Sequence, residues 1–187
     1  METYAQKDDL EYIVKNAPKD KKWKGLKKFC STLLKDWLFR KATMETLPVN
    51  IRHDLSINEL VKEAKFNGYV NPDVNDQNFP TKKRKAEKKE AVLLCLNSNA
   101  STKEAQEAMK RLKLIPGTPK ELLSLSLENP NLQRKFPIVA IGQSWRNPDG
   151  NRNVPFLNEW SGERDLSLGC LGSGWDEHYR FLAFCKS

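Results

Sequence analysis

The feature that most constrains the fold is the stretch of residues 136–184, in which apolar residues alternate with small or hydrogen-bonding ones. In Asp165–Leu166–Ser167–Leu168–Gly169 the alternation has a period of two, the pattern of a strand with one buried and one exposed face. The apolar positions recur as a frame, formed by Val154, Leu157, Leu166, Leu168, Leu171, Trp175 and Phe181. The stretch predicts an antiparallel sheet, whose remaining positions are either ordinary polar turns or a surface chosen for contact.

The charge of the chain is distributed unevenly. The net charge is +8; residues 1–135 hold 27 Lys and Arg against 18 Asp and Glu, whereas residues 136–187 hold 5 against 6. At 187 residues the chain could form one domain of ordinary size or a small domain with an appendage. Whatever the basic charge is for, it does not lie on the C-terminal stretch.

The first part of the chain predicts helices. One apolar stripe at three- and four-residue steps contains Trp23, Leu26, Cys30, Leu33, Leu34, Trp37 and Leu38. Ser56 and Glu59 form a capping-box pattern for a short helix that we expect Gly68 to end. Turn-forming residues follow at positions 71–80, then a run of lysine and arginine. We therefore expect a helical, basic N-terminal region over residues 1–85 and a second domain over residues 86–187.

The second domain reads as a strand, two helices and then several strands, an α+β arrangement. Residues 91–97 form a short apolar run of strand length. Capping patterns at Ser101 and Thr118 begin the two helices, and residues 137–145 predict a strand buried on both faces. These signals are consistent with one another without the upstream helices, so we expect residues 90–187 to fold alone.

The basic run Lys82–Lys89 has two interpretations. It could contact the phosphates of a nucleic acid, or it could be a solvated linker, which is the commoner role of a short run without interleaved aromatic residues. No apolar run approaches 18 residues, and the N-terminus has no hydrophobic signal segment. We therefore expect a cytoplasmic or virion-associated protein without membrane insertion.

The four cysteines, at positions 30, 95, 170 and 185, are widely spaced, and the two histidines, His53 and His178, are far apart. A structural zinc site needs clustered ligands, so this spacing predicts reduced thiols and no metal site or other cofactor. The sequence also contains no Ser/His/Asp arrangement or phosphate-binding loop, so it predicts no catalytic residues.

The order of these elements resembles the variable proteins of diversity-generating retroelements, in the branch found in small archaea, their viruses and ultra-small bacteria. The resemblance rests on a T-P-x-E-L-L helix, then N-P-x-x-Q-R-x-F-P-I-V-A-I-G-x-x-W at Asn129–Trp145. V-P-F-L follows at Val154–Leu157, an L-x-L-x-x-L-x-x-x-W frame at Leu166–Trp175, and Y-R-F-L-A at Tyr179–Ala183. The resemblance covers about residues 90–187 and does not extend to residues 1–85.

The resemblance implies a C-type lectin fold with a surface of programmed sequence variation. In such systems a reverse transcriptase misincorporates at template adenines, and AAY codons for Asn are rewritten. The ligand-binding, variable positions that it implies are Asn158, Trp160, Ser161, Asp165, Ser167, Gly169, Cys170, Gly172, Ser173, Gly174, Asp176, His178 and Tyr179. The positions from Asp165 onward hold residue types that can arise from an AAY codon when its adenines are substituted. Tryptophan cannot arise from an AAY codon in this way, so Trp160 is either fixed or derived from another adenine-bearing codon.

The leading hypothesis is a binding protein whose diversified face recognises a macromolecular ligand, most simply another protein. A rigid sheet with exchangeable side chains preorganises such a face. One rival is an enzyme, because formylglycine-generating enzymes share the lectin-like fold. Those enzymes need a paired-cysteine copper site, whereas here Cys170 and Cys185 are the only thiols in the relevant region and Cys170 is at an expected variable position. The other rival is a nucleic-acid-binding module that uses the lysine-rich N-terminal region.

Overall fold

The computed structural model describes residues 42–186 and, upstream of them, Tyr12, Lys15, Asn16, Lys28, residues 31–33 and Asp36. The chain divides into two compact units, residues 1–42 and residues 43–187. The apolar stripe expected between Trp23 and Leu38 lies almost entirely outside the described residues.

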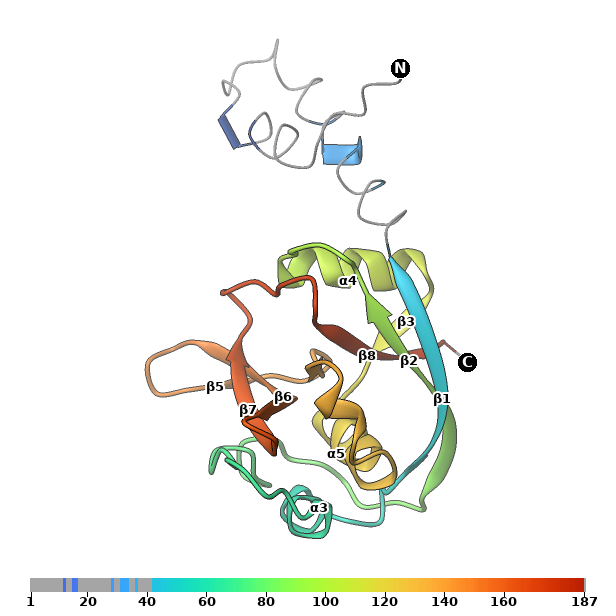
Figure 1. Cartoon of the computed structure of the whole chain (residues 1–187), viewed down its shortest axis with the longest axis vertical. Coiled ribbons are helices and arrows are strands. Elements are labelled where there is room, and N and C mark those ends of the chain that lie inside the picture. Colours follow the sequence, from blue (N-terminus) through green and yellow to red (C-terminus); the bar gives the residue numbers. More distant parts are fainter. Residues whose placement is uncertain are drawn as a thin grey trace. The chain divides into compact units, whose positions relative to one another are not determined.

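The second unit is an α+β domain, as the sequence predicted (Figure 1). Its helices are α3 (Ile57–Ala64), α4 (Thr102–Arg111) and α5 (Pro119–Glu128), with a single 3₁₀ turn, η1 (Leu132–Arg134). Its strands are β1 (Thr43–Ile51), β2 (Glu87–Cys95), β3 (Leu114–Pro116), β4 (Ile138–Val139), β5 (Trp145–Arg146), β6 (Arg152–Trp160), β7 (Glu163–Cys170) and β8 (Arg180–Cys185).

All eight strands belong to one sheet with the order β1-β2-β8-β4-β6-β5. Strand β3 pairs with β8, and β7 pairs with β6. Strands β2 and β8 are antiparallel, and β4 pairs with β8 in parallel. Strand β2 therefore lies beside β8, the last strand of the chain. Strands β6 and β7 form a hairpin on the other side of the sheet.

Three helices begin where the sequence predicted. Ser56, Ser101 and Thr118 each accept a hydrogen bond from the backbone N–H three residues later, and the Glu at that position bonds back to the backbone of the cap. These reciprocal bonds satisfy donors that the first turn of a helix leaves unpaired. The expected end of α3 at Gly68 is wrong, because the helix ends at Ala64 and Lys65 takes the left-handed conformation there.

The main core lies between α5 and the curved sheet. Figure 1 shows α5 inside this curve, with β1 and β2 on one side and β6 and β7 on the other. Leu122, Leu123 and Leu125 of α5 are fully buried, as are Leu157 of β6 and Leu182 of β8. The apolar strand expected over residues 137–145 is shorter than predicted. Only β4 and β5 form within it, although residues 138–141 are buried.

Residues 43–85 are part of this same core, so the compact units do not divide at residue 85. Strand β1 pairs with β2 over the whole length of both, from Thr43 opposite Cys95 to Ile51 opposite Glu87. Ile51 of β1 and Ile57 and Leu60 of α3 are fully buried in the cluster that contains the α5 leucines. The break in composition after residue 80 therefore marks a connection inside one domain.

Arg164 of β7 links this upstream segment to the rest. Its Nη1 donates to the Ala64 backbone oxygen at 3.0 Å, and its Nη2 donates to Ser126 Oγ at 2.8 Å and to the Ser126 backbone oxygen at 3.3 Å. The guanidinium also lies 5.1 Å from the ring centroid of Phe66. One buried cation thus satisfies carbonyls near the C-terminal ends of both α3 and α5, where the helix dipole favours positive charge.

The backbone beyond α3 extends the sheet past β7. Asn71 N donates to Leu166 O, and Leu166 N donates to Tyr69 O, both at 2.8 Å. Asp165 Oδ1 accepts a hydrogen bond from Tyr69 N at 2.7 Å. A Cβ on Gly68 would lie only 2.1 Å from that oxygen, so the close approach requires glycine. We call Arg164, Asp165 and their partners in residues 64–69 the clasp.

No helix in the part of the chain that the structure describes is both long and apolar enough to cross a membrane.

Candidate functional site

The outer face of the β6–β7 hairpin contains several of the residues expected to contact a ligand. The register places Phe156 opposite Ser167, Asn158 opposite Asp165 and Val154 opposite Gly169. Directly opposed residues in an antiparallel pair share one face, so these side chains lie on the face away from Leu157 and Leu166, which are buried in the core. The expectation of one buried and one exposed face in β7 is wrong, because Asp165 is only 9% exposed and Ser167, Leu168 and Gly169 are all half-buried. On the same face of β6, Val154 is fully buried.

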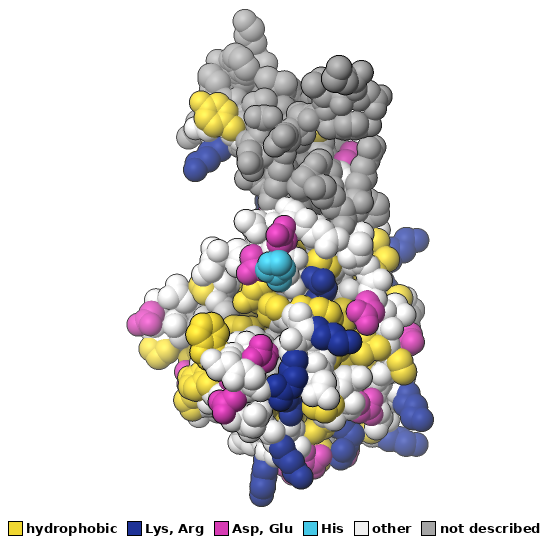
Figure 2. Space-filling view, in the orientation of Figure 1, with side chains coloured by type: hydrophobic (Ala, Val, Ile, Leu, Met, Phe, Trp, Pro, Cys, Tyr) yellow, Lys and Arg dark blue, Asp and Glu magenta, His cyan; other side chains and the backbone are white. Residues whose placement is uncertain are grey.

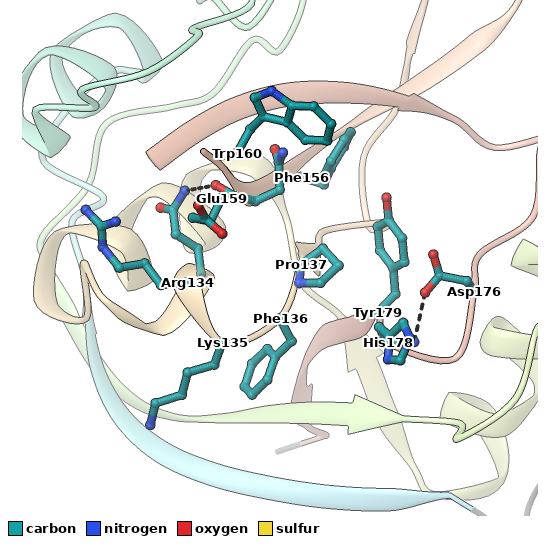
Figure 3. Close-up of a pocket in the computed structure, with 12 residues that line it drawn as sticks. Arg134, Lys135, Phe136, Pro137, Phe156, Glu159, Trp160, Asp176, His178 and Tyr179 are labelled. Carbon is teal, nitrogen blue, oxygen red and sulfur yellow. Dashed lines mark hydrogen bonds between the residues drawn. The ribbon is translucent and has the colours of Figure 1, made fainter. Parts of the chain in front are cut away.

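An open groove of about 600 Å³ lies beside this face (Figure 3). It is lined by residues 133–137 and 158–160 with Phe156, Asp176, His178 and Tyr179. Figure 3 shows Trp160 and Phe156 along one side, Phe136 and Pro137 across from them, and Tyr179 beside His178 and Asp176. The walls thus come from three parts of the chain: η1 with the segment that follows it, strand β6, and the turn before β8.

Aromatic rings follow one another along the groove. Trp160 is 74% exposed, which is unusual for the largest apolar side chain. The ring centroids of Phe156 and Tyr179 are 5.9 Å apart, and those of Tyr179 and Trp175 are 5.1 Å apart. Burial, reinforced by the negative charge of Asp176, raises the pKa of the Tyr179 phenol above its usual value. Tyr179 therefore keeps its proton and can donate a hydrogen bond.

Trp175 supports this row from below, as the sequence predicted for a frame residue; it is only 5% exposed. Its Nε1 donates to Thr102 Oγ1 at 2.9 Å, and that hydroxyl donates to Leu171 O at 2.7 Å. Its backbone exchanges two hydrogen bonds of 2.8 Å with Ala100. A Cβ on Gly169 would lie 3.0 Å from the indole, so this glycine lets the ring pack against β7.

Asn158 places a polar group in the groove. Its backbone oxygen accepts a hydrogen bond of 2.6 Å from Gln133 Nε2, which also donates to Asp165 O. These bonds fix the strand at this point. The side-chain oxygen Oδ1 of Asn158 is buried and has no hydrogen-bond partner among the described residues. A buried acceptor without a partner costs free energy, and because this oxygen has almost no exposed surface it is not open to a ligand.

The charges around the groove are of both signs. Arg134, Lys135 and the acidic Glu159 lie toward one end, and Asp176 and His178 lie at the other (Figure 3). The Arg134 guanidinium donates to Gly162 O and to Asn131 Oδ1, and Asp176 Oδ1 accepts from His178 N at 2.8 Å. On the face visible in Figure 2, exposed hydrophobic side chains lie between basic and acidic ones. Neither sign of charge dominates that face.

Of the thirteen positions predicted to vary, five line the groove: Asn158, Trp160, Asp176, His178 and Tyr179. Ser161, Gly172 and Ser173 are exposed in turns, whereas Ser167, Gly169, Cys170 and Gly174 are partly buried. Asp165 differs from the expectation. It is only 9% exposed, and its carboxylate holds the backbone of Tyr69 within the clasp. Asp165 is therefore a structural residue and is not open to a ligand.

The sequence patterns did not predict the groove residues outside the expected variable positions: Gln133, Arg134, Lys135, Phe136, Pro137, Phe156 and Glu159. A signal existed for Phe156, because the period-two pattern through β6 puts it on the same face as Asn158 and Trp160. Residues 133–137 gave no comparable signal, since they reach the groove through the pairing of β4 with β6 and β8.

The basic run Lys82–Lys89 is partly paired with acids of the same domain. Lys83 lies 2.7 Å from Glu59, and Arg84 lies 3.5 Å from Glu87. Lys89 lies 3.5 Å from Glu87 and 3.8 Å from Glu121. These pairs connect the run to α3 and α5, which reduces the charge available for phosphate contacts.

Comparison of the chain with protein-family models, with curated proteins and with solved structures gives no match.

Proposed function

We propose that this protein is a binding protein that presents a diversified surface, as the variable proteins of diversity-generating retroelements do, on a C-type lectin-like fold. The proposal rests most on one observation. Five positions predicted to vary, from β6 and from the turn before β8, converge on a single groove. The frame residues between them, such as Leu166, Trp175 and Phe181, are buried. The five groove positions are thus separated from these frame residues, whereas Asp165 and Gly169, which were also predicted to vary, contact the frame and the clasp.

The order of elements supports the lectin-like part of the proposal. Within residues 87–185 the first strand, β2, and the last, β8, are antiparallel neighbours, and helices α4 and α5 follow β2. Antiparallel strands β6 and β7 then precede β8. This order is consistent with the strand, two helices and antiparallel strands that the resemblance implies, with the short strand β3 added between the helices and β4 paired in parallel with β8. Strand β1 and helix α3 add to that arrangement without changing it.

A surface of this kind can bind a partner non-covalently, with no catalytic step. Trp160, Phe156 and Tyr179 offer large contact area at low entropic cost, because aromatic rings have few rotatable bonds. Asp176 and His178 add hydrogen-bonding groups at the edge of the groove. Binding would depend on these few aromatic anchors, with the exchangeable positions deciding which partner fits.

Two matched libraries test the proposal. The first randomises five exposed positions: Trp160, Gly172, Ser173, Asp176 and His178. The second randomises Asp165, Gly169 and Trp175, which support the surface from within. We expect most members of the first library to melt cooperatively near the parent temperature, since each surface change typically costs within about ±0.5 kcal/mol. We expect most members of the second to lose that transition.

If most members of the first library fail to fold, those five residues are structural and the diversified-surface proposal is wrong. Sequencing the DNA beside the gene provides an independent check. The proposal expects a near-copy of the 3′ end that differs mainly at adenines, next to a reverse transcriptase gene. The nucleic-acid alternative instead expects salt-dependent binding to nonspecific DNA that Lys82→Glu with Lys85→Glu abolishes.

A further inference from the structure

The groove has a constant wall as well as exchangeable positions. Arg134, Lys135 and Phe136 lie outside the thirteen positions predicted to vary, yet they line the same groove. This wall is held in place from two sides. Gln133 is 2% exposed and bonded to the backbone of both β6 and β7, and the Arg180 guanidinium lies 4.7 Å from the Phe136 ring centroid. Any ligand of the groove must therefore be compatible with the three side chains of this wall, whichever residues occupy the exchangeable positions.

The two ends of the groove differ in charge, although the basic end also holds the Glu159 carboxylate, which accepts a hydrogen bond from Gly162 N. Arg134 and Lys135 are exposed, and among the described residues neither has an acidic side chain within salt-bridge distance. At the other end Asp176 and its neighbour Glu177 are also exposed. Charges of opposite sign attract partners with the complementary order of charge and repel partners with the reverse order.

This order of charge argues against a nucleic acid in the groove. A polynucleotide carries a phosphate at every step, so the part that satisfied Arg134 and Lys135 would bring further phosphates toward Asp176. A polypeptide can carry an acid at one end, apolar side chains in the middle and a base at the other. The centre of the groove suits those apolar side chains, because Phe156, Trp160 and Tyr179 line it.

We propose that the groove takes an extended segment of a partner protein, with an acidic side chain toward Arg134 and Lys135 and an aromatic or aliphatic side chain packed against Phe156 and Tyr179. This inference rests on the proposed function and specifies its ligand. Arg134 and Lys135 form a constant selectivity element that a diversified copy would share with its relatives, whereas the exchangeable positions would tune the rest of the segment.

The experiment selects a phage-displayed library of random linear peptides against three forms of the full chain. These are the unchanged protein, the double variant Arg134→Glu with Lys135→Glu, and a control, Lys82→Glu with Lys85→Glu, which makes the same change of net charge on an exposed segment away from the groove. Thermal melts first establish that each protein is folded. Where the double variant is unfolded, Lys135→Glu alone replaces it.

We expect peptides enriched on the unchanged protein to share an acidic residue beside an aromatic or aliphatic one. On the double variant the acidic residue should be replaced by Lys or Arg, and the original peptides should bind about tenfold more weakly, equivalent to about 1.4 kcal/mol. The control should select the same peptides as the unchanged protein. Trp160→Ala should weaken the binding of those peptides in every background.

Three results would overturn the inference: no enrichment on the unchanged protein, enriched peptides without an acidic residue, or a consensus that survives the charge reversal. Binding of a single-stranded oligonucleotide that is lost in the groove variant and kept in the Lys82 and Lys85 control would also overturn it in favour of nucleic acid. The proposed function fails separately, because its library test measures folding and needs no ligand.

Discussion

The clasp and the groove lie at the same β6–β7 hairpin, yet they use their residues in opposite ways. Arg164 in the clasp is 7% exposed and its hydrogen bonds go to Gln133, Ser126 and the backbone at the end of α3. Trp160 in the groove, four residues earlier, is 74% exposed. A charged residue is thus buried and an aromatic one is open to solvent, the reverse of the usual preference.

The two exceptions have different physical meanings. Burial lowers the pKa of the Arg164 guanidinium, and Arg134 lowers it further, so the charge is held only because hydrogen bonds to several acceptors offset the loss of water. That arrangement serves stability and the geometry of the domain. Trp160 leaves most of its side chain in water, and it lines the groove together with Phe156 and Tyr179. Residues of the clasp should therefore affect folding, and residues of the groove should affect binding.

Removing the upstream part of the clasp should have the largest effect. We expect residues 43–187 to unfold cooperatively, whereas residues 90–187 should aggregate or lack a cooperative transition. The shorter fragment loses β1 and α3, which leaves the edge of β2 open and uncovers core residues such as Leu123. Thermal or denaturant unfolding of the two fragments measures the difference. A cooperative transition in the shorter one would restore the boundary near residue 85 that the composition suggested.

Trp175→Ala should destabilise the domain by about 3–5 kcal/mol, the range for truncation of a large buried aromatic. The indole contacts Tyr179 and Phe181 and donates to Thr102, so the variant leaves a cavity and removes one of the two hydrogen bonds of the Thr102 hydroxyl. Urea unfolding measures the loss. Trp160→Ala removes the same side chain from an exposed position and is the matched control; equal losses in the two variants would contradict the comparison.

Arg164→Ala should cost on the order of 3 kcal/mol, because it leaves carbonyls of Ala64 and Ser126 buried without their donor. Arg164→Lys keeps the positive charge and loses the forked geometry, so it should recover only part of the loss. The denaturant concentrations at the unfolding midpoints of both variants show whether stability falls from the parent to Arg164→Lys and then to Arg164→Ala. A loss below about 0.5 kcal/mol for Arg164→Ala would mean that the clasp does not stabilise the domain.

Acidification should weaken the domain through His53 by a smaller amount. Burial, followed by the positive charge of Arg84, lowers the pKa of the His53 imidazole below its ordinary value of 6.5. Arg84 Nη2 lies 2.7 Å from His53 Nε2, which must therefore accept the hydrogen bond in its neutral form. Because the folded protein binds this proton less readily than the unfolded chain, stability is complete above the unfolded pKa and is lost as pH falls toward the folded one.

Other charged groups face His53 and modify this effect. Glu87 lies 3.7 Å from Nε2, and the negative charge of Glu121 raises the pKa, whereas the positive charges of Lys120 and Lys89 lower it. Unfolding free energies measured between about pH 7.5 and about pH 5 should fall, and His53→Gln should flatten that part of the profile. An unchanged profile in the variant would assign the pH dependence to other groups.

The smallest effect on stability should come from the groove itself. Trp160→Ala should change the free energy of unfolding by no more than about 0.5 kcal/mol, because its side chain is mostly in water. His178→Ala should behave similarly, since His178 is also exposed. Thermal melts check both. A loss of several kcal/mol in Trp160→Ala would place this residue in the fold and remove the distinction between the clasp and the groove.

The sequence by itself determined the local features of this protein. Each capping box depends on two residues three positions apart, and the burial of Leu166 was predicted from alternation within one strand, so both depend on short segments of sequence. The exposed face that the same alternation predicted for β7 does not form. The α+β class and the buried role of Trp175 followed from such windows as well.

Only the tertiary structure decided where the domain begins and which positions meet in the groove. Arg164 bonds to Ala64, 100 residues away in sequence, and Tyr69 bonds to Asp165 across 96. No periodicity records such pairs, so Asp165 looked like an exposed position and residues 43–85 looked like a separate region. The wall of residues 133–137 reaches β6 in the same way, through strand pairing. Local hydrogen bonds and alternation act over a few residues, whereas burial and pairing depend on which distant segments the folded chain brings together.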